Sequence, residues 1–286
     1  MNVQVLPITS ADVSRVAHFL HAHLNTRLSV DMWARALTPP WKAAAPNHGF
    51  MLIAAGLVVG VYLAFYADRT IGGARHRFCN LAGWCVLPEY RLLSIRLLRA
   101  LLKQPGYHFT DLSPSGTVIP MNERLGFRHL DSTLVAVPNL PWPARPRGDR
   151  TVTADPRRIE DLLSGDDLER YRDHRDALAA RHVVLADRGG VCWAVFRHDR
   201  PKNLPFFASL VHVSDQAVFR RMFRPFTRHL LLRHGVPATL LEPRVAGFRP
   251  PGAITVPTER RRMYRSDTLD PDRIDLLYSE LVAVPF

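Results

Sequence analysis

The 286-residue sequence has few of the residues that build covalent or metal-bound scaffolds, since it contains only three cysteines. Cys79, Cys85 and Cys192 lie in apolar segments, form no Cys-x-x-Cys pair and have no histidines at metal-ligand spacing. These features argue against a disulfide framework and against a zinc site, and they favour a reducing compartment. We therefore expect a cytoplasmic protein that holds no metal.

Lysine is nearly absent, so the positive charge comes almost entirely from arginine. Lysine occurs only at positions 42, 103 and 202, although Lys and Arg together number 38 against 26 Asp and Glu, for a net charge of +12. Such a charge attracts anions in general: nucleic acid, membrane headgroups, phosphorylated cofactors or an acidic carrier protein. The charge does not choose among them.

The sequence also lacks a long uninterrupted apolar run. Its most apolar stretch, residues 50–66, contains Gly56 and Gly60 and is better explained as two strands than as a membrane span. The first residues show no basic region followed by an apolar run, the pattern of a signal peptide. We expect a soluble protein.

Hydrophobic periodicity and turn residues predict an α/β fold. The first half predicts strands at 3–8, 49–56, 57–69, 78–87, 107–114 and 133–138, with helices at about 9–25, 29–37, 90–103 and 119–125. The second and third of these strands predict a hairpin that turns near Ala55-Gly56. This order predicts a mixed, mostly antiparallel sheet flanked by helices. A proline-rich stretch at 139–152 predicts a linker between a domain at 1–138 and a second at 153–286.

The second half repeats the pattern of the first. The segments that begin at Met51 and His182 are 131 residues apart, and at this offset Phe65 matches Phe196 and Asp68 matches Asp199. Both halves also end in the pentapeptide LVAVP. Hydrophobic strands resemble one another by chance, but the shared order favours a duplication.

Three segments of the first half together carry a family resemblance: "AGWCVLPEYR", "FTDLSPSG" and "NERLGFRHLD". In order and spacing they resemble the GNAT-fold acyltransferases of the GCN-related N-acetyltransferase superfamily. The second half resembles a degenerate copy, so the whole is similar to proteins with two GNAT-like domains. In the second half, Pro225 interrupts the predicted helix, no Arg-x-x-Gly pattern precedes it, and we expect no donor site there.

The resemblance implies a donor site for a pantetheine thioester. In the family, the turn after the fourth strand reads R/Q-x-x-G-x-G/A, and its amides bind the pyrophosphate of coenzyme A. Arg91 matches this pattern, whereas Ser94 and Arg96 replace its two small residues, and Arg96 would either crowd the phosphates or bind them. The residues implied in donor binding are Cys85, Val86, Leu87, Arg91, Leu92, Ser94, Ile95 and Arg96.

The resemblance also implies acid and base roles. Where many family members have a tyrosine as general acid, this sequence has Asn122, which leaves three alternatives: Asn122 binds the leaving thiolate, Ser113 or Ser115 replaces the acid, or the domain is impaired. Asp111 and His76 are the first candidates for the base.

Other residues of the first half have less support. Glu89 and His129 are weaker candidates for the base. Cys85 fits an inert buried thiol better than a nucleophile. Trp33 and Trp41 fit either core packing or an acceptor wall.

The expected activity is acyl transfer from acetyl-CoA, a longer acyl-CoA or an acyl carrier protein to an amine or hydroxyl of a small molecule or peptide. The direct attack needs no metal. Two alternatives remain. One is an aminoacyl-tRNA-dependent transferase of the Fem type, because the basic charge of the protein would suit binding to RNA. The other is an inactive binding protein.

Overall fold

The computed structural model describes residues 2–143, 150–199, 207–258 and 261–285, which form two compact units. The described residues of 1–130, 260–274 and 278–285 make up unit 1, and those of 131–259 with 275–277 make up unit 2. The end of the chain therefore belongs to the unit that contains its beginning. Residues 144–149 of the predicted linker lie outside the described residues.

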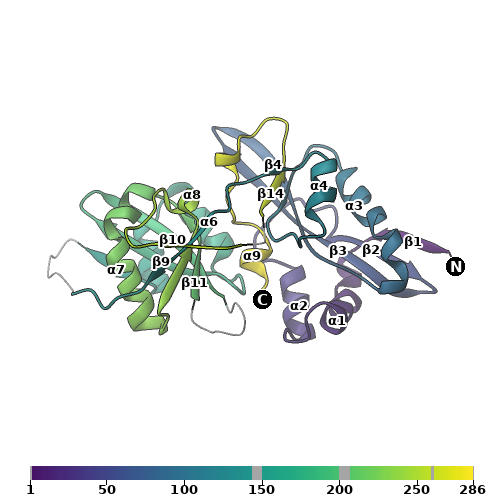
Figure 1. The fold of residues 1–286 in the computed structure, drawn as a ribbon, viewed down its shortest axis with the longest axis horizontal. Helices are drawn as coiled ribbons and strands as arrows, with labels where there is room; N and C mark the ends of the chain where they lie inside the picture. The colour runs from purple at the N-terminus through teal and green to yellow at the C-terminus, as the bar shows by residue number, and fades with distance from the viewer. Residues whose placement is uncertain (1, 144–149, 200–206, 259–260, 286) are drawn as a thin grey trace. The chain divides into compact units, whose positions relative to one another are not determined.

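The sheet of unit 1 has seven strands in the order β1-β2-β3-β4-β5-β14-β6 (Figure 1). Their bounds are β1 Val3–Pro7, β2 Gly49–Ala54, β3 Leu57–Ile71, β4 Ala74–Val86, β5 His108–Asp111, β14 Met263–Arg265 and β6 Arg128–His129. Strands β4 and β5 run parallel, and the other neighbouring strands run antiparallel. The helices are α1 Val13–His23, α2 Val30–Leu37, α3 Ile95–Leu102, α4 Ile119–Arg124 and α9 Glu280–Ala283, with 3-10 helices η1 Ser10–Asp12, η2 Pro88–Leu93 and η4 Pro271–Arg273.

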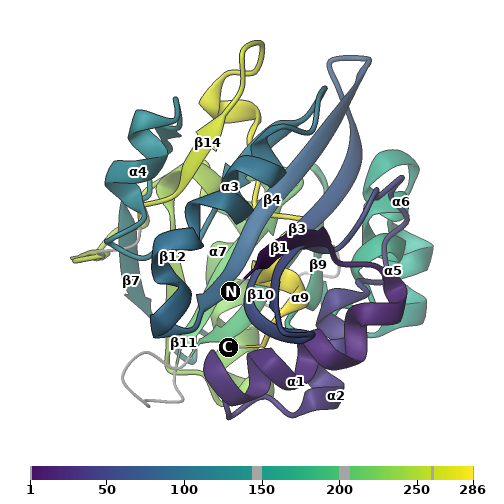
Figure 2. The ribbon, with the colours of Figure 1, turned by 90° about the vertical axis from the view of Figure 1, so that its right-hand side faces the viewer.

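Side-chain alternation along β3 gives this sheet two buried faces. Tyr62, Ala64 and Tyr66 belong to the core cluster that contains Leu97 and Leu101 of α3, and the intervening Leu63 and Phe65 are also buried. Helices α1 and α2 lie on one side of the sheet and α3 on the other (Figures 1 and 2). Burying both faces explains why this segment is nearly continuously apolar.

Unit 2 has the same strand order and directions as unit 1. Its sheet is β8-β9-β10-β11-β12-β7-β13, in which β11 and β12 are the parallel pair. The bounds are β8 Thr151–Thr153, β9 Arg181–Asp187, β10 Gly190–Asp199, β11 Phe207–Val213, β12 Ala238–Leu241, β7 Leu134–Pro138 and β13 Ile254–Val256. The helices are α5 Pro156–Leu162, α6 Gly165–His174, α7 Gln216–His234 and α8 Pro243–Ala246. The predicted fold class, two mostly antiparallel mixed sheets with flanking helices, is confirmed.

The sixth strand of each sheet comes from the other half of the sequence. Strand β7, expected as the last strand of the first domain, pairs with β12 and β13 of unit 2. In unit 1 the equivalent place, between β5 and β6, is taken by β14 near the end of the chain. The two units therefore do not meet at a single sequence boundary at 139–152. The sequence could not predict this division, because strand pairing across large sequence separations leaves no local signal.

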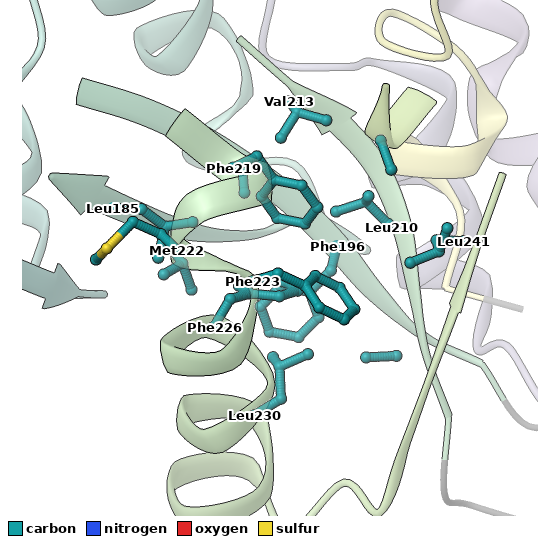
Figure 3. Packing of buried hydrophobic residues seen from close by; sticks show 14 of the residues in the cluster. Leu185, Phe196, Leu210, Val213, Phe219, Met222, Phe223, Phe226, Leu230 and Leu241 are labelled. Carbon is teal, nitrogen blue, oxygen red and sulfur yellow. The ribbon is translucent and has the colours of Figure 1, made fainter. Parts of the chain in front are cut away.

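Helix α7 continues through Pro225, so the predicted interruption of the helix at this proline is wrong. Phe219, Met222 and Phe226 of α7 are fully buried against the sheet of unit 2 (Figure 3). A proline inside a helix costs roughly 3 kcal/mol, whereas burying one large apolar side chain contributes about 1.5–3 kcal/mol. The buried aromatic face therefore outweighs the proline.

Candidate functional site

Strand β4 separates from β5 halfway along its length. Pairing runs from Phe78 opposite His108 to Leu81 opposite Asp111, where β5 ends. Strand β4 continues to Val86, and in the described part of the chain residues 82–86 have no strand partner on the β5 side. One edge of this segment therefore offers main-chain groups that the sheet does not use.

A β-bulge lies where the two strands separate. In the β3–β4 ladder Val61 pairs with Cys85 and Leu63 with Ala82, so two residues of β4, Gly83 and Trp84, oppose Tyr62. Gly83 has φ +59°, a conformation that favours glycine. A bulge of this kind increases the local twist, which turns β4 away from β5 directly after their last pair.

A buried carboxylate lies at the end of β5. Asp111 is 4% exposed and accepts a 2.8 Å hydrogen bond from Asn122 Nδ2, while the Tyr62 hydroxyl lies 3.5 Å from the same oxygen. Burial raises the pKa of Asp111 to about 7, although hydrogen bonds from Asn122 and from the Ser113 backbone oppose the increase. A carboxyl group with this pKa can exchange a proton near neutral pH.

Two polar atoms beside this carboxylate have no hydrogen-bond partner among the described residues. They are Asn122 Oδ1 and Trp84 Nε1, and both are buried. The Trp84 ring stacks on Tyr62, with centroids 4.4 Å apart and planes 9° apart. Leaving a buried donor or acceptor unsatisfied costs about 1–3 kcal/mol, which a ligand that pairs with these atoms would recover.

The turn after β4 is a 3-10 helix rather than an open glycine loop. Helix η2 leads through Ser94 into α3, whose first two residues are Ile95 and Arg96. The first amides of an α-helix have no partner within the helix and lie at its positive end. Leu92 is 94% exposed, and Arg91 is exposed as well.

The Arg96 side chain is directed to β1 rather than to the turn. Its Nη1 donates to the Val3 carbonyl oxygen of β1 at 2.9 Å. The Ser94 side chain makes no capping hydrogen bond to α3. The Ser94 amide donates to the Arg91 carbonyl oxygen and the Leu97 amide to the Ser94 carbonyl oxygen. The remaining first-turn amides of α3, the uncharged Ser94 side chain and the exposed Arg91 can therefore face an anion.

Unit 2 differs at the equivalent turn. Helix α7 begins after Asp215, whose carboxylate accepts a 2.8 Å hydrogen bond from the Val218 amide. An aspartate at this position already satisfies a first-turn amide and would repel a phosphate.

Helical spacing of Arg220, Arg221, Arg224 and Arg228 in the sequence predicts a basic ridge on α7, and three of these arginines have contacts within unit 2. Arg221 pairs with Asp187, Arg220 lies over the Phe248 ring and Arg224 lies over the Trp142 ring. Asp187 therefore offsets the charge of Arg221, whereas Arg220 and Arg224 keep their charge beside neutral rings.

The structure brings Asp111, Ser113 and Asn122 together and places the other candidates elsewhere. His76 lies at the opposite end of β4, where its Nδ1 is 3.0 Å from His108 Nε2. His129 pairs with Glu123 on the surface. A further set of candidates, Glu89 and Ser115, is exposed.

Three more candidates have core-like surroundings. Burial raises the pKa of the Cys85 thiol, which disfavours its nucleophilic thiolate form. Trp33 and Trp41 are buried, and Trp41 Nε1 donates to the Tyr66 carbonyl oxygen. In the described ranges, no group of three or more metal-binding side chains is arranged to hold an ion, and no helix is long and apolar enough to cross a membrane.

Sequence reasoning missed Tyr62, Gly83, Trp84 and Glu280. A glycine inside a strand signals a bulge, so the pair Gly83-Trp84 was available as a signal. Tyr62 lies in the apolar stretch 50–66, where nothing in the sequence distinguishes it from core residues. Glu280 carried no signal, because it reaches Asn80 and Ser113 from the end of the chain.

No family model matches this sequence, and no curated protein matches it. Solved structures match it at low identity. A GCN5-related N-acetyltransferase from Anabaena variabilis has a TM-score of 0.61 and 11% identity, covering 92% of this chain and 72% of that one. A probable N-acyltransferase from Enterococcus faecalis has a TM-score of 0.59 and 12% identity, covering 93% and 73%.

A third match is N-myristoyltransferase of Saccharomyces cerevisiae with bound myristoyl-CoA. Its TM-score is 0.50 at 10% identity, and the match covers 96% of this chain and 83% of that one. At such identities the likeness concerns the fold. The chain has the fold of the GCN5-related N-acetyltransferases.

Proposed function

We propose that this protein is an acyltransferase that moves an acyl group from an acyl-CoA to an amine or hydroxyl acceptor, with its donor site in unit 1. The supporting observation is the separation of β4 from β5 at a buried carboxylate with a pKa near 7. An open main-chain edge and a proton acceptor are the two elements that attack on a thioester needs.

The residues present fit an acyl-CoA. Its pyrophosphate would lie at the first turn of α3, near Ile95, Ser94 and Arg91, where amides and a guanidinium favour an anion. Its pantetheine arm would follow the free edge of β4 at 82–87, which includes Cys85, Val86 and Leu87. When bound, the donor supplies a thioester carbonyl that is open to attack.

Asp111 would hold the proton that the attacking amine or hydroxyl loses. As the new bond to the acyl carbon forms and the carbon–sulfur bond breaks, coenzyme A would leave as its thiolate and the Asp111 carboxylate would become neutral, which its apolar surroundings favour. Asn122 would orient Asp111, since its amide donates to that carboxylate. Trp84 Nε1 would supply a donor to a ligand oxygen.

Acyl-CoA binding should raise the melting temperature, and Arg91→Ala should remove most of the rise. Differential scanning fluorimetry with acetyl-CoA and myristoyl-CoA measures both, and the myristoyl donor is included because a structural neighbour binds it. Binding at 100 times Kd stabilises a protein by about 2.7 kcal/mol.

Arg99→Ala is the matched control, because Arg99 is an exposed arginine of α3 beyond its first turn. It should keep the full thermal shift. If acyl-CoA raises the melting temperature of neither the parent protein nor the control, the donor assignment is wrong. A shift with acyl carrier protein alone would replace acyl-CoA by that carrier.

A further inference from the structure

The last residues of the chain bring a second carboxylate into unit 1. After β14, the chain reaches α9, where the Ser279 hydroxyl accepts a hydrogen bond from the Leu281 amide and so fixes the first turn. Glu280, the first residue of α9, is 0% exposed. A fully buried glutamate needs polar partners to remain charged.

Glu280 has these partners at the point where β4 and β5 separate. Its Oε1 accepts the Ser113 hydroxyl at 2.6 Å, and its Oε2 accepts Asn80 Nδ2. Asn80 is oriented in turn by Thr110, whose hydroxyl donates to its Oδ1 at 2.9 Å. Each side chain in this hydrogen-bonded series is held by its neighbour, so the fold specifies the position of the Glu280 carboxylate.

Ser113 connects the two carboxylates. Its backbone N–H donates to Asp111, and its hydroxyl donates to Glu280. Strand alternation places Asn80 and Thr110 on the face opposite to Leu81 and Asp111. The two carboxylates therefore approach the end of β5 from opposite faces of the sheet.

We infer that Glu280 is a positioning residue of the proposed site, which fixes the Ser113 hydroxyl and places a second negative charge near Asp111. This inference rests on the proposed function, since it assigns Asp111 the role of proton acceptor. A neighbouring negative charge makes a carboxylate hold its proton more strongly. Glu280 thus makes Asp111 a stronger base than burial alone would.

Among the described ionisable groups around Asp111, Glu280 is the one whose negative charge raises the Asp111 pKa near neutral pH. Tyr62 on β3 stays neutral, because burial raises its pKa well above the ordinary value. Burial raises the pKa of the Cys79 thiol on β4 in the same way. Burial raises the pKa of Glu280 above its ordinary value, and the hydrogen bonds from Ser113 and Asn80 oppose this increase. Arg262, which precedes β14 and donates to the Leu112 carbonyl oxygen, also favours the ionised form of Glu280. Asn122 of α4 carries no charge.

Glu280→Gln tests the inference, because it removes the charge and keeps the shape of the side chain. In protein labelled with ¹³C at the Asp carboxyl carbons, and with Asp111 identified by Asp111→Asn, we expect the Asp111 pKa to fall by about one unit. The acidic limb of the kcat/KM profile should move to lower pH by the same amount. A residue with only a structural role would leave both unchanged.

Glu242→Gln is the matched control, since Glu242 is a buried glutamate of unit 2. It should leave the Asp111 titration as it is. An unchanged Asp111 titration in folded Glu280→Gln overturns the inference. If Glu280→Gln does not fold, the titration of Asp111 in the parent protein tests the inference instead. Coupled groups titrate in two steps, so a single step at an ordinary Asp pKa would also overturn the inference.

The same measurements separate the two proposals. A shifted Asp111 titration without turnover of any acyl donor contradicts the proposed function and leaves the charge coupling in place. Turnover with an unshifted titration contradicts the role of Glu280 alone.

Discussion

Asp111→Asn should lower kcat/KM for acyl transfer by about 100-fold or more, because loss of a general base typically costs 10²–10⁴ in rate. The amide keeps the size of the side chain and can still accept from Asn122 and the Ser113 backbone, but it cannot take a proton at neutral pH. Affinity for the acyl donor, measured by calorimetry, should stay the same, since Asp111 lies at the end of β5 and not at the first turn of α3.

The same substitution should stabilise unit 1 above neutral pH. The folded pKa of Asp111, about 7, lies above the ordinary value of 3.8, so the folded state holds a proton that the unfolded state has already released. The parent protein therefore loses stability as pH rises from about 4 to 7, and the loss is complete above 7. Three pKa units correspond to about 4 kcal/mol, the upper limit of the gain for Asp111→Asn.

Hydrogen exchange of unit 1 amides at pH 5 and pH 8 measures this gain, which should be larger at pH 8. Asp187→Asn, measured by exchange of unit 2 amides, is a control of opposite sign, because the hydrogen-bonded ion pair with Arg221 lowers the pKa of Asp187. That variant should lose stability above pH 4. Equal stability of Asp111→Asn and the parent protein at both pH values would show that burial does not destabilise the ionised form of Asp111.

Local patterns of the sequence predicted most strands and helices of the first half, although not which sheet each strand joins. The turn at Ala55-Gly56 connects β2 and β3 as expected, with positive φ at both residues. Such a hairpin depends on a short stretch of chain, which propensity and alternation describe adequately. The α/β class followed because strands and helices alternate in the sequence as they do in the fold.

The pentapeptide LVAVP shows where local patterns fail. At 134–138 it forms strand β7, whereas at 281–285 its first three residues belong to helix α9. The identical segments therefore do not mark the same element of a repeat, although both sheets do share one strand order. Ser279 begins a helix in the second case, while pairing with β12 and β13 makes a strand in the first.

The candidate site likewise combines residues that are close in the sequence with one that is distant. Asp111, Ser113 and Asn122 were predicted from the family resemblance, whose segments "FTDLSPSG" and "NERLGFRHLD" contain all three within a dozen residues. Glu280 is 167 residues from Ser113, and no periodicity connects the two. Its role follows only from the strand β14, which brings the end of the chain into the first sheet.

Ser94→Asp should weaken acyl-CoA binding by roughly 30-fold, because it places a negative charge where the proposed site holds a pyrophosphate. The substitution copies unit 2, in which Asp215 occupies the start of α7. It should not destabilise unit 1, since an acidic residue at a helix N-terminus is favourable by about 0.3–1 kcal/mol. Lost affinity with retained stability would separate a blocked anion site from a damaged fold.

Ser94→Asn isolates the charge, because asparagine has nearly the same shape as aspartate and is neutral. Isothermal titration calorimetry should give this variant an affinity near that of the parent protein, and the difference between the two variants should shrink as salt screens the charge. Asp215→Ser, the reciprocal change in unit 2, should leave acyl-CoA affinity unchanged and have little effect on stability, because serine can also accept the first-turn hydrogen bond that Asp215 accepts from the Val218 amide. Equal affinities of Ser94→Asp and Ser94→Asn would place the phosphates away from α3, and with them the donor site.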